Sequence, residues 1–380
     1  MELYVHIPYC RQKCRYCDFA SFANSENTQS MYVADVLKEA ALLAEQHPHE
    51  QMATAYIGGG TPSVLPPALL EKLLHGIFAV FPIKTDAEFT TEANPGTLTA
   101  EWLQTAVRYG INRLSLGMQA IQPELLHTLG RIHDFQQVQQ SVLLAHEAGI
   151  TNISLDLMFG LPGQTVAMWR ESIEAALSLG VRHLSCYGLI PEEGTPLFAD
   201  LQSKRLSLPD EEDERRMYDL TLDLLAKAGF RQYEISNFAM PGYECRHNIG
   251  YWRQEAYVGL GVSAASYWST PAERLRIANP RTIPAYHQMI ERSDWSMREQ
   301  TVITDADSRF ETMMLGLRMN EGVSEAAFTA MHHASLDELY GEKLRAFARQ
   351  GLLRYSDGRW ALTRRGMEVQ NAILVELMDS

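Results

Sequence analysis

The sequence contains few cysteines, no long apolar run and no excess of basic residues. Five cysteines in 380 residues are an odd number, too few for a disulfide framework, and no secretory signal precedes them. The longest apolar stretch, residues 73–83, is interrupted by His75, Gly76 and Pro82 and is too short to span a bilayer. We therefore expect a protein of the reducing cytoplasm, without disulfides and without a membrane anchor.

The charge balance is acidic, with 33 Lys and Arg against 47 Asp and Glu and a formal net charge of −14. Because phosphate contacts need a basic surface, we expect no nucleic-acid partner. The hydrophobic content of 46% is ample for a core. The length suggests two or three domains, or one large barrel with an appendage.

Three of the five cysteines lie together near the N-terminus. Cys10, Cys14 and Cys17 have the spacing CX3CX2C and follow directly after an expected strand at residues 3–7. A [4Fe–4S] cluster needs a ligand on each of four irons, so three thiolates leave one iron open. An amino acid that chelates through its amino and carboxylate groups, such as S-adenosylmethionine (SAM), fits there. A zinc site completed by His6 remains an alternative.

Up to residue 190 the sequence alternates short apolar runs with helical periodicity. Strands are expected at residues 3–7, 54–57, 88–92, 113–116, 153–157 and 183–187. Helices at 99–110 and 165–180 each run from an N-cap threonine to a C′ glycine. The alternation predicts parallel strands with right-handed crossovers, and therefore an incomplete (β/α)6 barrel that is open along one side.

A polar or glycine feature follows every expected strand, at the rim where β/α barrels carry their chemistry. These features are the three cysteines, Gly58 to Thr61, Glu92, Gln119, Asp156, and Tyr187 with Gly188. Each alone has an ordinary explanation as a cap, turn or loop residue. Their recurrence on one rim predicts a shared site.

The segments around these residues resemble one known family. Residues 4–10 (YVHIPYC), the cysteine triad, 58–62 (GGGTP) and 156–165 (DLMFGLPGQT) are together similar to the oxygen-independent coproporphyrinogen III oxidase family of radical SAM proteins. Within that family the chain most resembles the HemW-type heme chaperones, over essentially its whole length. The resemblance implies a radical SAM barrel, a cluster on Cys10, Cys14 and Cys17, and bound SAM and heme.

The resemblance also implies which other residues face the cofactors. The SAM site would be lined by Tyr4, Gly59, Gly60, Thr61, Glu92, Gln119, Arg131 and Asp156. Tyr16 would pack on the adenine, and Arg131 would suit the SAM carboxylate. Without the resemblance, Arg131 would be read as a solvated loop arginine.

Two features separate the chaperones from the oxidases. The oxidases carry a further cysteine two positions after the triad, where this chain has Phe19, and they begin with a longer N-terminal segment. We therefore count Phe19 among the residues at the cofactor site and expect no decarboxylase activity. No residue is assigned a catalytic role.

Residues 247–252 (HNIGYW) match the HNXXYW motif of the chaperones. Imidazole is a common axial ligand of heme iron, so His247 is the expected heme ligand. The alternative is a β-segment whose histidine makes an ordinary hydrogen bond in the core. Cys245, two residues upstream, is either a further ligand or a plain thiol.

The chain beyond the barrel divides into two further regions. Residues 196–299 are expected to extend the sheet and to carry the heme motif, after the barrel at 1–195. Residues 300–380 read as helices followed by a hairpin at Asp357 and Gly358, which resembles a winged helix. The acidic charge favours packing or docking over DNA binding for this small domain.

The sequence thus favours a heme chaperone that binds SAM and a [4Fe–4S] cluster and passes heme to acceptor hemoproteins, respiratory ones among them. The alternatives are a coproporphyrinogen III oxidase and a zinc-bound structural protein.

Overall fold

The computed structural model describes residues 1–23, 25–46, 51–269 and 273–378. Six parallel strands form the centre of the fold and are hydrogen-bonded in sequence order. They are β1 (Glu2–Ile7), β2 (Met52–Gly59), β3 (Ile83–Ala93), β4 (Arg113–Gln119), β5 (Asn152–Phe159) and β6 (His183–Gly188). The predicted partial (β/α)6 barrel is confirmed.

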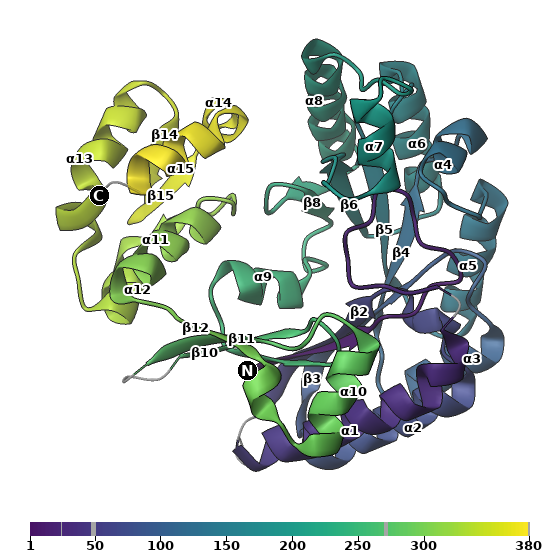
Figure 1. The fold of residues 1–380 in the computed structure, drawn as a ribbon. Helices are drawn as coiled ribbons and strands as arrows, with labels where there is room; N and C mark the ends of the chain where they lie inside the picture. The colour runs from purple at the N-terminus through teal and green to yellow at the C-terminus, as the bar shows by residue number, and fades with distance from the viewer. Residues whose placement is uncertain (24, 47–50, 270–272, 379–380) are drawn as a thin grey trace.

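Helices joining these strands cover the outer face of the sheet, as Figure 1 shows. They are α1 (Gln29–Gln46), α2 (Pro67–Val80), α3 (Ala100–Arg108), α4 (Pro123–Thr128), α5 (Phe135–Glu147) and α6 (Val166–Ser178). The side chains of Thr99 and Thr165 accept hydrogen bonds from the backbone N–H groups of Trp102 and Met168, as N-caps do. Both helices therefore begin where the sequence predicts.

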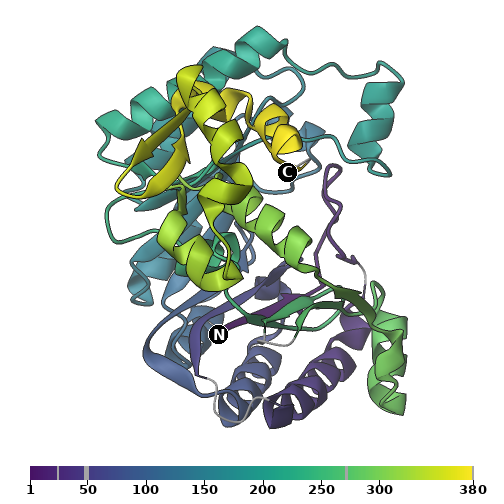
Figure 2. The ribbon, with the colours of Figure 1, turned by 90° about the vertical axis from the view of Figure 1, so that its left-hand side faces the viewer.

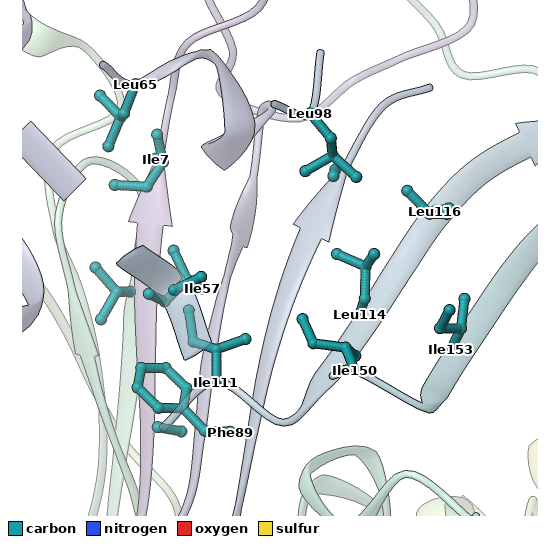
Figure 3. Packing of buried hydrophobic residues seen from close by; sticks show 14 of the residues in the cluster. Ile7, Ile57, Leu65, Phe89, Leu98, Ile111, Leu114, Leu116, Ile150 and Ile153 are labelled. Atoms are coloured by element: carbon teal, nitrogen blue, oxygen red, sulfur yellow. The ribbon is translucent and has the colours of Figure 1, made fainter. Parts of the chain in front are cut away.

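Strand alternation sorts the side chains of the barrel into two layers. Outward-facing positions are apolar and pack under the helices. Figure 3 shows Ile57 of β2, Phe89 of β3, Leu114 and Leu116 of β4 and Ile153 of β5 in this layer. The inward-facing positions are largely polar, so the barrel interior is a lumen lined by hydrogen-bonding groups.

Further strands extend the sheet beyond both ends of the barrel. β9 (Tyr257–Leu260) pairs in parallel with β1 and is followed by β10 (Ala265–Ser269), β11 (Arg274–Ala278) and β12 (Glu299–Val302). β8 (Asn237–Ala239) and β7 (Arg231–Gln232) continue from β6 on the other side. Twelve strands of the described residues thus form one sheet, and the expected extension is confirmed.

Four helices of the middle region complete this part of the fold. They are α7 (Pro196–Gln202), α8 (Glu211–Lys227), α9 (Arg246–Trp252) and α10 (Ile283–Arg292). Figure 1 shows α9 between the barrel and the C-terminal region. This helix contains the HNXXYW residues, so the alternative reading of that motif as a β-segment is wrong.

The C-terminal region has a hydrophobic core of its own, centred on Phe328, Leu344 and Trp360. Its elements are α11 (Asp305–Gly316), β13 (Val323–Ser324), α12 (Glu325–His332), α13 (Leu336–Arg349), β14 (Leu353–Ser356), β15 (Arg359–Leu362), α14 (Arg364–Glu368) and α15 (Gln370–Met378). β14 and β15 form the hairpin predicted at Asp357 and Gly358. Figure 2 shows these elements in front of the barrel, and they have the expected winged-helix-like arrangement.

The boundaries of the three regions, 1–195, 196–299 and 300–380, stay a prediction. Ion pairs bridge the C-terminal region to the rest, including Arg253 with Glu321 at 2.9 Å and Arg215 with Glu368 at 2.7 Å. No helix of the described residues is long and apolar enough to cross a membrane.

Truncation of Leu114 tests the outer layer of the barrel. Leu114 is fully buried between β4 and the helices. Leu114→Ala should lower the free energy of unfolding by about 2–5 kcal/mol, because a cavity remains in a close-packed layer. Denaturant unfolding of the purified protein measures this. Leu143→Ala, on a leucine that is 50% exposed, is the control and should change stability by less than about 0.5 kcal/mol.

Candidate functional site

The loop that follows β1 carries the three cysteines across the rim of the barrel (Figure 1). Backbone hydrogen bonds fix it at both sides: the Arg15 N–H donates to the Leu129 carbonyl, and the Arg15 carbonyl accepts from the Leu197 N–H, each at 2.9 Å. Cys10, Cys14 and Cys17 are free thiols and partly exposed. The loop is therefore held in place while its sulfur atoms stay accessible.

The three cysteines line one cavity of about 370 Å³, here called the cysteine cavity. Eight other predicted site residues line it as well: Tyr16, Phe19, Gly59, Gly60, Glu92, Gln119, Arg131 and Asp156. They come from the carboxyl ends of β2 to β5 and from the loops that follow β1 and α4. The structure thus brings together the rim residues that the sequence singled out, whereas Tyr4, Thr61 and His247 are not among the residues lining this cavity.

The glycine run at the end of β2 allows a close approach of backbone to side chains. Gly59 has a φ of +106°, and a Cβ there would lie 2.3 Å from the ring of His6. Its N–H donates to Glu92 Oε2 at 3.0 Å, and the Tyr56 hydroxyl donates to Glu92 Oε1 at 2.8 Å. Glycine is required here because any side chain would displace His6 and strain the backbone.

Arg131 links two of the predicted features. Its Nη1 donates to Cys14 Sγ at 3.3 Å, and its Nη2 donates to Gln119 Oε1 at 3.2 Å and to Asn94 Oδ1 at 2.9 Å. Its Nε is buried and has no partner among the described residues. The guanidinium therefore places a positive charge beside the thiols and keeps one donor unused, so it is not the solvated loop arginine of the alternative reading.

Two further residues of the cavity have unusual environments. Gln119 is a non-glycine residue with a φ of 60°, at the register shift between β4 and β5. Such backbone strain is common at functional sites. Asp156 accepts from the Ser115 hydroxyl at 3.2 Å, and burial raises the pKa of its carboxyl.

The alternative zinc site needs His6, whose ring is already engaged. His6 Nε2 donates to the Ala20 carbonyl at 2.8 Å, and Nδ1 accepts from the Tyr4 hydroxyl at 3.0 Å. Across the described part of the chain, no group of three His, Cys, Asp or Glu side chains is arranged to hold a metal ion. A cubane places each thiolate on a different iron, so its cysteines need not converge on one point. The arrangement suits a cluster better than Cys3His zinc.

Thr61 and Tyr4 lie just outside the cysteine cavity. The Thr61 hydroxyl donates to Cys10 Sγ at 3.5 Å and accepts from Asn94 Nδ2 at 2.9 Å. It therefore supports a thiol. Tyr4 lines a different cavity, described below as the tyrosine cavity.

Several residues lining the cysteine cavity were not predicted. They are Ser21, Tyr56, Ala93, Asn94, Arg113, Ser115, Gly117, Met158, Ser185 and Asn248, whereas Tyr187, which the sequence placed on the rim, lines the cavity as expected. Strand alternation was a signal for those on the inward faces of β2, β4 and β6, since they alternate with the buried apolar positions. Asn94 follows directly after β3, where the carboxyl-end rule applies. Asn248 had no such signal, because only the closure of the fold brings α9 to this cavity.

His247 is buried in the barrel lumen with an exposed fraction of 1%. Its Nδ1 is hydrogen-bonded to Thr54 Oγ1 at 2.7 Å and its Nε2 to the Tyr251 hydroxyl at 2.9 Å. Its ring stacks on that of Tyr56 with centroids 5.1 Å apart. Burial and the nearby charge of Arg113 lower its pKa to about 3, so the imidazole is neutral. The structure separates His247 from the cysteines and uses both of its nitrogens.

Glu88 of β3 caps the helix that carries His247. Its Oε1 accepts from the His247 N–H and its Oε2 from the Arg246 N–H, each at 3.1 Å. Cys245 Sγ donates to the same carboxylate at 3.5 Å, and burial raises the pKa of this thiol to about 12. Cys245 is therefore an ordinary buried thiol.

The side chains of the cysteine cavity fit an iron–sulfur cluster with an amino acid on its open iron. Three thiols supply soft ligands, and Arg131 and the carboxyl residues Glu92 and Asp156 line the same space. The guanidinium and the carboxyls can pair with the charged groups of an amino acid. The donor set is that of a cluster with an organic ligand.

Comparisons with known proteins show which families the chain is similar to. The Radical SAM superfamily model matches residues 4–176, and the HemN C-terminal domain model matches residues 303–369. A heme chaperone HemW of Bacillus subtilis is 38% identical over 98% of this chain and 99% of its own length. The heme chaperone HemW of Escherichia coli is 35% identical over 98% of this chain and 97% of its own length.

One solved structure is similar over the whole chain. The radical SAM enzyme coproporphyrinogen III oxidase (HemN) from Escherichia coli has a TM-score of 0.85 and 21% identity, covering 100% of this chain and 90% of its own. At that identity the similarity concerns the fold alone.

The titration of Glu92 gives a test of the site in the cluster-free protein. Burial, and next the charge of Asp156, raise the pKa of Glu92 from 4.5 to about 7, against the hydrogen bonds from Tyr56 and Gly59. The folded state therefore holds this proton more tightly than the unfolded state. The contribution of Glu92 to stability is complete below about pH 4.5 and is lost as the pH rises through about 7.

We expect the unfolding free energy of the wild type, relative to Glu92→Gln, to fall by roughly 2–3 kcal/mol between pH 4.5 and pH 8. Chemical denaturation at a series of pH values measures this difference. Glu101→Gln, on the exposed first turn of α3, is the matched control and should show no such trend. A difference that does not change with pH would contradict the raised pKa.

Proposed function

The chain belongs to the HemW family of heme chaperones, and from this premise we propose that it binds heme and a SAM-ligated [4Fe–4S] cluster and delivers heme to acceptor hemoproteins. One observation carries the cofactor part of the proposal. Cys10, Cys14 and Cys17 line a single cavity together with eight rim residues from four strands and two loops. A purely structural loop would not need that convergence.

Within the proposal each residue of the cysteine cavity has a role. The three cysteines hold the cluster, while Arg131 and Thr61 donate hydrogen bonds to the sulfurs of Cys14 and Cys10. Such bonds stabilise thiolates, which are the form that binds iron. When bound, the cluster and SAM supply one-electron chemistry that side chains lack.

The remaining rim residues hold SAM. The guanidinium of Arg131, which lines the cavity, suits the SAM carboxylate. Glu92 and Asp156 suit the ribose hydroxyls or the amino group, and the backbone of Gly59 and Gly60 lets the ligand approach closely. Tyr16 packs on the adenine, with Gln119 and Phe19 at the same cavity.

The cargo of the chaperone is heme, and the HNXXYW helix α9 is its proposed site. The acceptors are hemoproteins, among which respiratory ones are the most direct users. We propose that the protein binds and delivers heme in the reducing cytoplasm, because the free thiols at the cavity have to remain available to iron.

The runner-up function is oxidative decarboxylation of coproporphyrinogen III. It rests on the fold shared with the Escherichia coli oxidase. Against it, Phe19 occupies the position where the oxidase pattern has a further cysteine, and its side chain is 68% exposed at the cavity. An apolar side chain there cannot supply a thiol.

Loss of one cysteine should abolish the cluster. Cys10→Ala, Cys14→Ala and Cys17→Ala should each bind little iron after anaerobic reconstitution, because a cubane requires a ligand from the protein at three irons. Iron analysis and the visible absorption of the cluster measure this. Cys186→Ala, on a buried thiol outside the loop, is the matched control and should retain about four irons per chain. Full iron loading of all three loop variants would contradict the assignment.

Direct handover of heme tests the function itself. The protein loaded with ferric heme is mixed with a heme-free respiratory cytochrome, in the presence of excess apomyoglobin that captures any dissociated heme. We expect the cytochrome to gain its heme spectrum despite the trap, since a chaperone transfers its cargo within a complex. Free heme at the same concentration is the control and should go to the trap.

A separate enzyme assay distinguishes the two candidate functions. Reconstituted protein with SAM, a reductant and coproporphyrinogen should give no protoporphyrinogen by chromatography. Sustained formation of that product, with no heme handover, would favour the oxidase over the chaperone.

A further inference from the structure

A second cavity lies beside α9 and shares no lining residue with the cysteine cavity. It is about 310 Å³ in volume, and we call it the tyrosine cavity because Tyr4, Tyr251, Tyr257 and Tyr267 line it. Gln254, Ala265, Arg276, Glu311 and Leu315 complete its wall. The cavity is therefore mainly aromatic and lies between β1, β9 to β11 and helix α11.

The tyrosine rings form a continuous aromatic wall. Tyr251 meets Tyr257 edge to face with centroids 4.7 Å apart, and Tyr257 lies 6.3 Å from Tyr267. Arg276 is the only cation that lines this cavity in the described part of the chain, and it is paired with Glu311 at 2.9 Å. Such walls suit a flat apolar ring whose anionic groups remain in solvent.

Tyr251 connects this cavity to His247. The Tyr251 ring lines the cavity, while its hydroxyl is hydrogen-bonded to His247 Nε2 at 2.9 Å. His247 itself is only 1% exposed and is not among the residues lining the cavity. Tyr251 is thus the residue through which the HNXXYW motif reaches this cavity.

We propose that ferric heme enters the tyrosine cavity, that the phenol oxygen of Tyr251 binds its iron, and that His247 is the residue that positions this oxygen. The proposal rests on the heme-binding part of the proposed function and revises which residue carries the iron. Tyrosinate is an established axial ligand of ferric heme. A His247–iron bond through Nε2 would instead require Tyr251 to leave and its hydrogen bond to Nε2 to break.

The binding step is balanced without any added reagent. Ferric heme in water carries hydroxide on its iron. The Tyr251 O–H bond and the iron–hydroxide bond break, the iron–phenolate bond forms, and the proton leaves with the hydroxide as water. The oxidation state of the iron does not change.

The contacts of His247 allow it to support the oxygen before and after this step. In the free protein the Tyr251 hydroxyl donates to a neutral imidazole, whose other nitrogen is bonded to Thr54 Oγ1 at 2.7 Å. The Thr54 hydroxyl can accept a hydrogen bond from Nδ1–H or donate one to an unprotonated Nδ1. It can therefore pair with either tautomer of His247. After the phenol loses its proton, the other tautomer presents Nε2–H to the oxygen. A residue that holds a ligand in this way also fixes its orientation.

The spectrum of the wild-type protein with ferric heme tests the assignment first. We expect a charge-transfer absorption from phenolate to iron, and resonance Raman bands of an iron-bound phenolate. A spectrum of imidazole-ligated heme without those bands would overturn the proposal, while heme binding and the proposed function would stand. No binding of heme at all would instead contradict the proposed function.

Two variants separate the ligand from the residue that positions it. Tyr251→Phe should lose the phenolate bands and bind heme more than about 100-fold more weakly. Loss of a residue that only supports a ligand usually lowers affinity by about 10- to 100-fold. His247→Gln should keep the bands, since an amide can also donate to the oxygen, with affinity reduced by about tenfold. Loss of the heme spectrum in His247→Gln, with an unchanged spectrum in Tyr251→Phe, would make His247 the ligand.

The barrel offers a matched control for both variants. Tyr233 bonds His183 Nε2 at 2.8 Å, and His183 Nδ1 bonds Ser154 Oγ at 2.7 Å, so this trio repeats the contacts of Tyr251, His247 and Thr54. Tyr233 does not line the tyrosine cavity. Tyr233→Phe therefore removes the same type of buried bond, together with the bond that the Cys245 N–H donates to the Tyr233 hydroxyl at 3.2 Å at the start of α9, and should still leave the phenolate bands of the heme spectrum in place. An equal loss in Tyr233→Phe would indicate general disruption of the lumen and overturn the proposal.

Discussion

The polar lumen of the barrel is the constraint on which the rest of the structure depends. Every central strand places a buried polar side chain at the same end of the lumen: Glu2, Thr54, Glu88, Arg113, Ser154 and His183. Groups of this kind are costly to bury without partners. Helix α9 closes this layer, because the Glu88 carboxylate accepts the first N–H groups of the helix while Thr54 bonds His247.

The position of α9 follows from that closure and gives several residues of the run 247–252 a contact of their own. Asn248 lines the cysteine cavity, whereas Tyr251 lines the tyrosine cavity. Gly250 lies against Glu2, and a Cβ on Gly250 would be 1.8 Å from that carboxylate. One short helix thus touches both cavities and the lumen between them. A molecule bound in either cavity would therefore contact the same helix, α9.

The two cavities differ in the chemistry that they present. The cysteine cavity has thiols, a guanidinium and carboxyls at the strand ends, where parallel barrels concentrate polar groups. The tyrosine cavity has rings and, among the residues that the structure describes, a single cation, Arg276, which is already neutralised by Glu311. Tyr56 lies between them, since it bonds Glu92 at one end and stacks on His247 at its face. The fold therefore keeps the polar cysteine cavity apart from the mainly aromatic tyrosine cavity, and Tyr56 lies between them.

The sequence by itself determined the strands, the helix caps, the hairpin at Asp357 and the set of rim residues around the cysteines. Each of these depends on local pattern: apolar alternation, a threonine before a helix, a turn dipeptide, or the end of a parallel strand. Phe19 was singled out by the family resemblance, because the oxidases have a cysteine at that position. Local patterns of this kind can be recognised in the sequence because they depend on residues that are close together in the chain.

Only the tertiary structure decided which contacts the motif around His247 makes. The bond between Thr54 and His247 joins residues 193 positions apart, and no periodicity in the sequence encodes it. The same holds for Glu88 beneath Cys245, for Asn248 in the cysteine cavity and for Tyr4 outside it. Which nitrogen or oxygen is free for a ligand depends on partners that closure of the barrel brings together, so it is a property of the folded lumen and not of the motif.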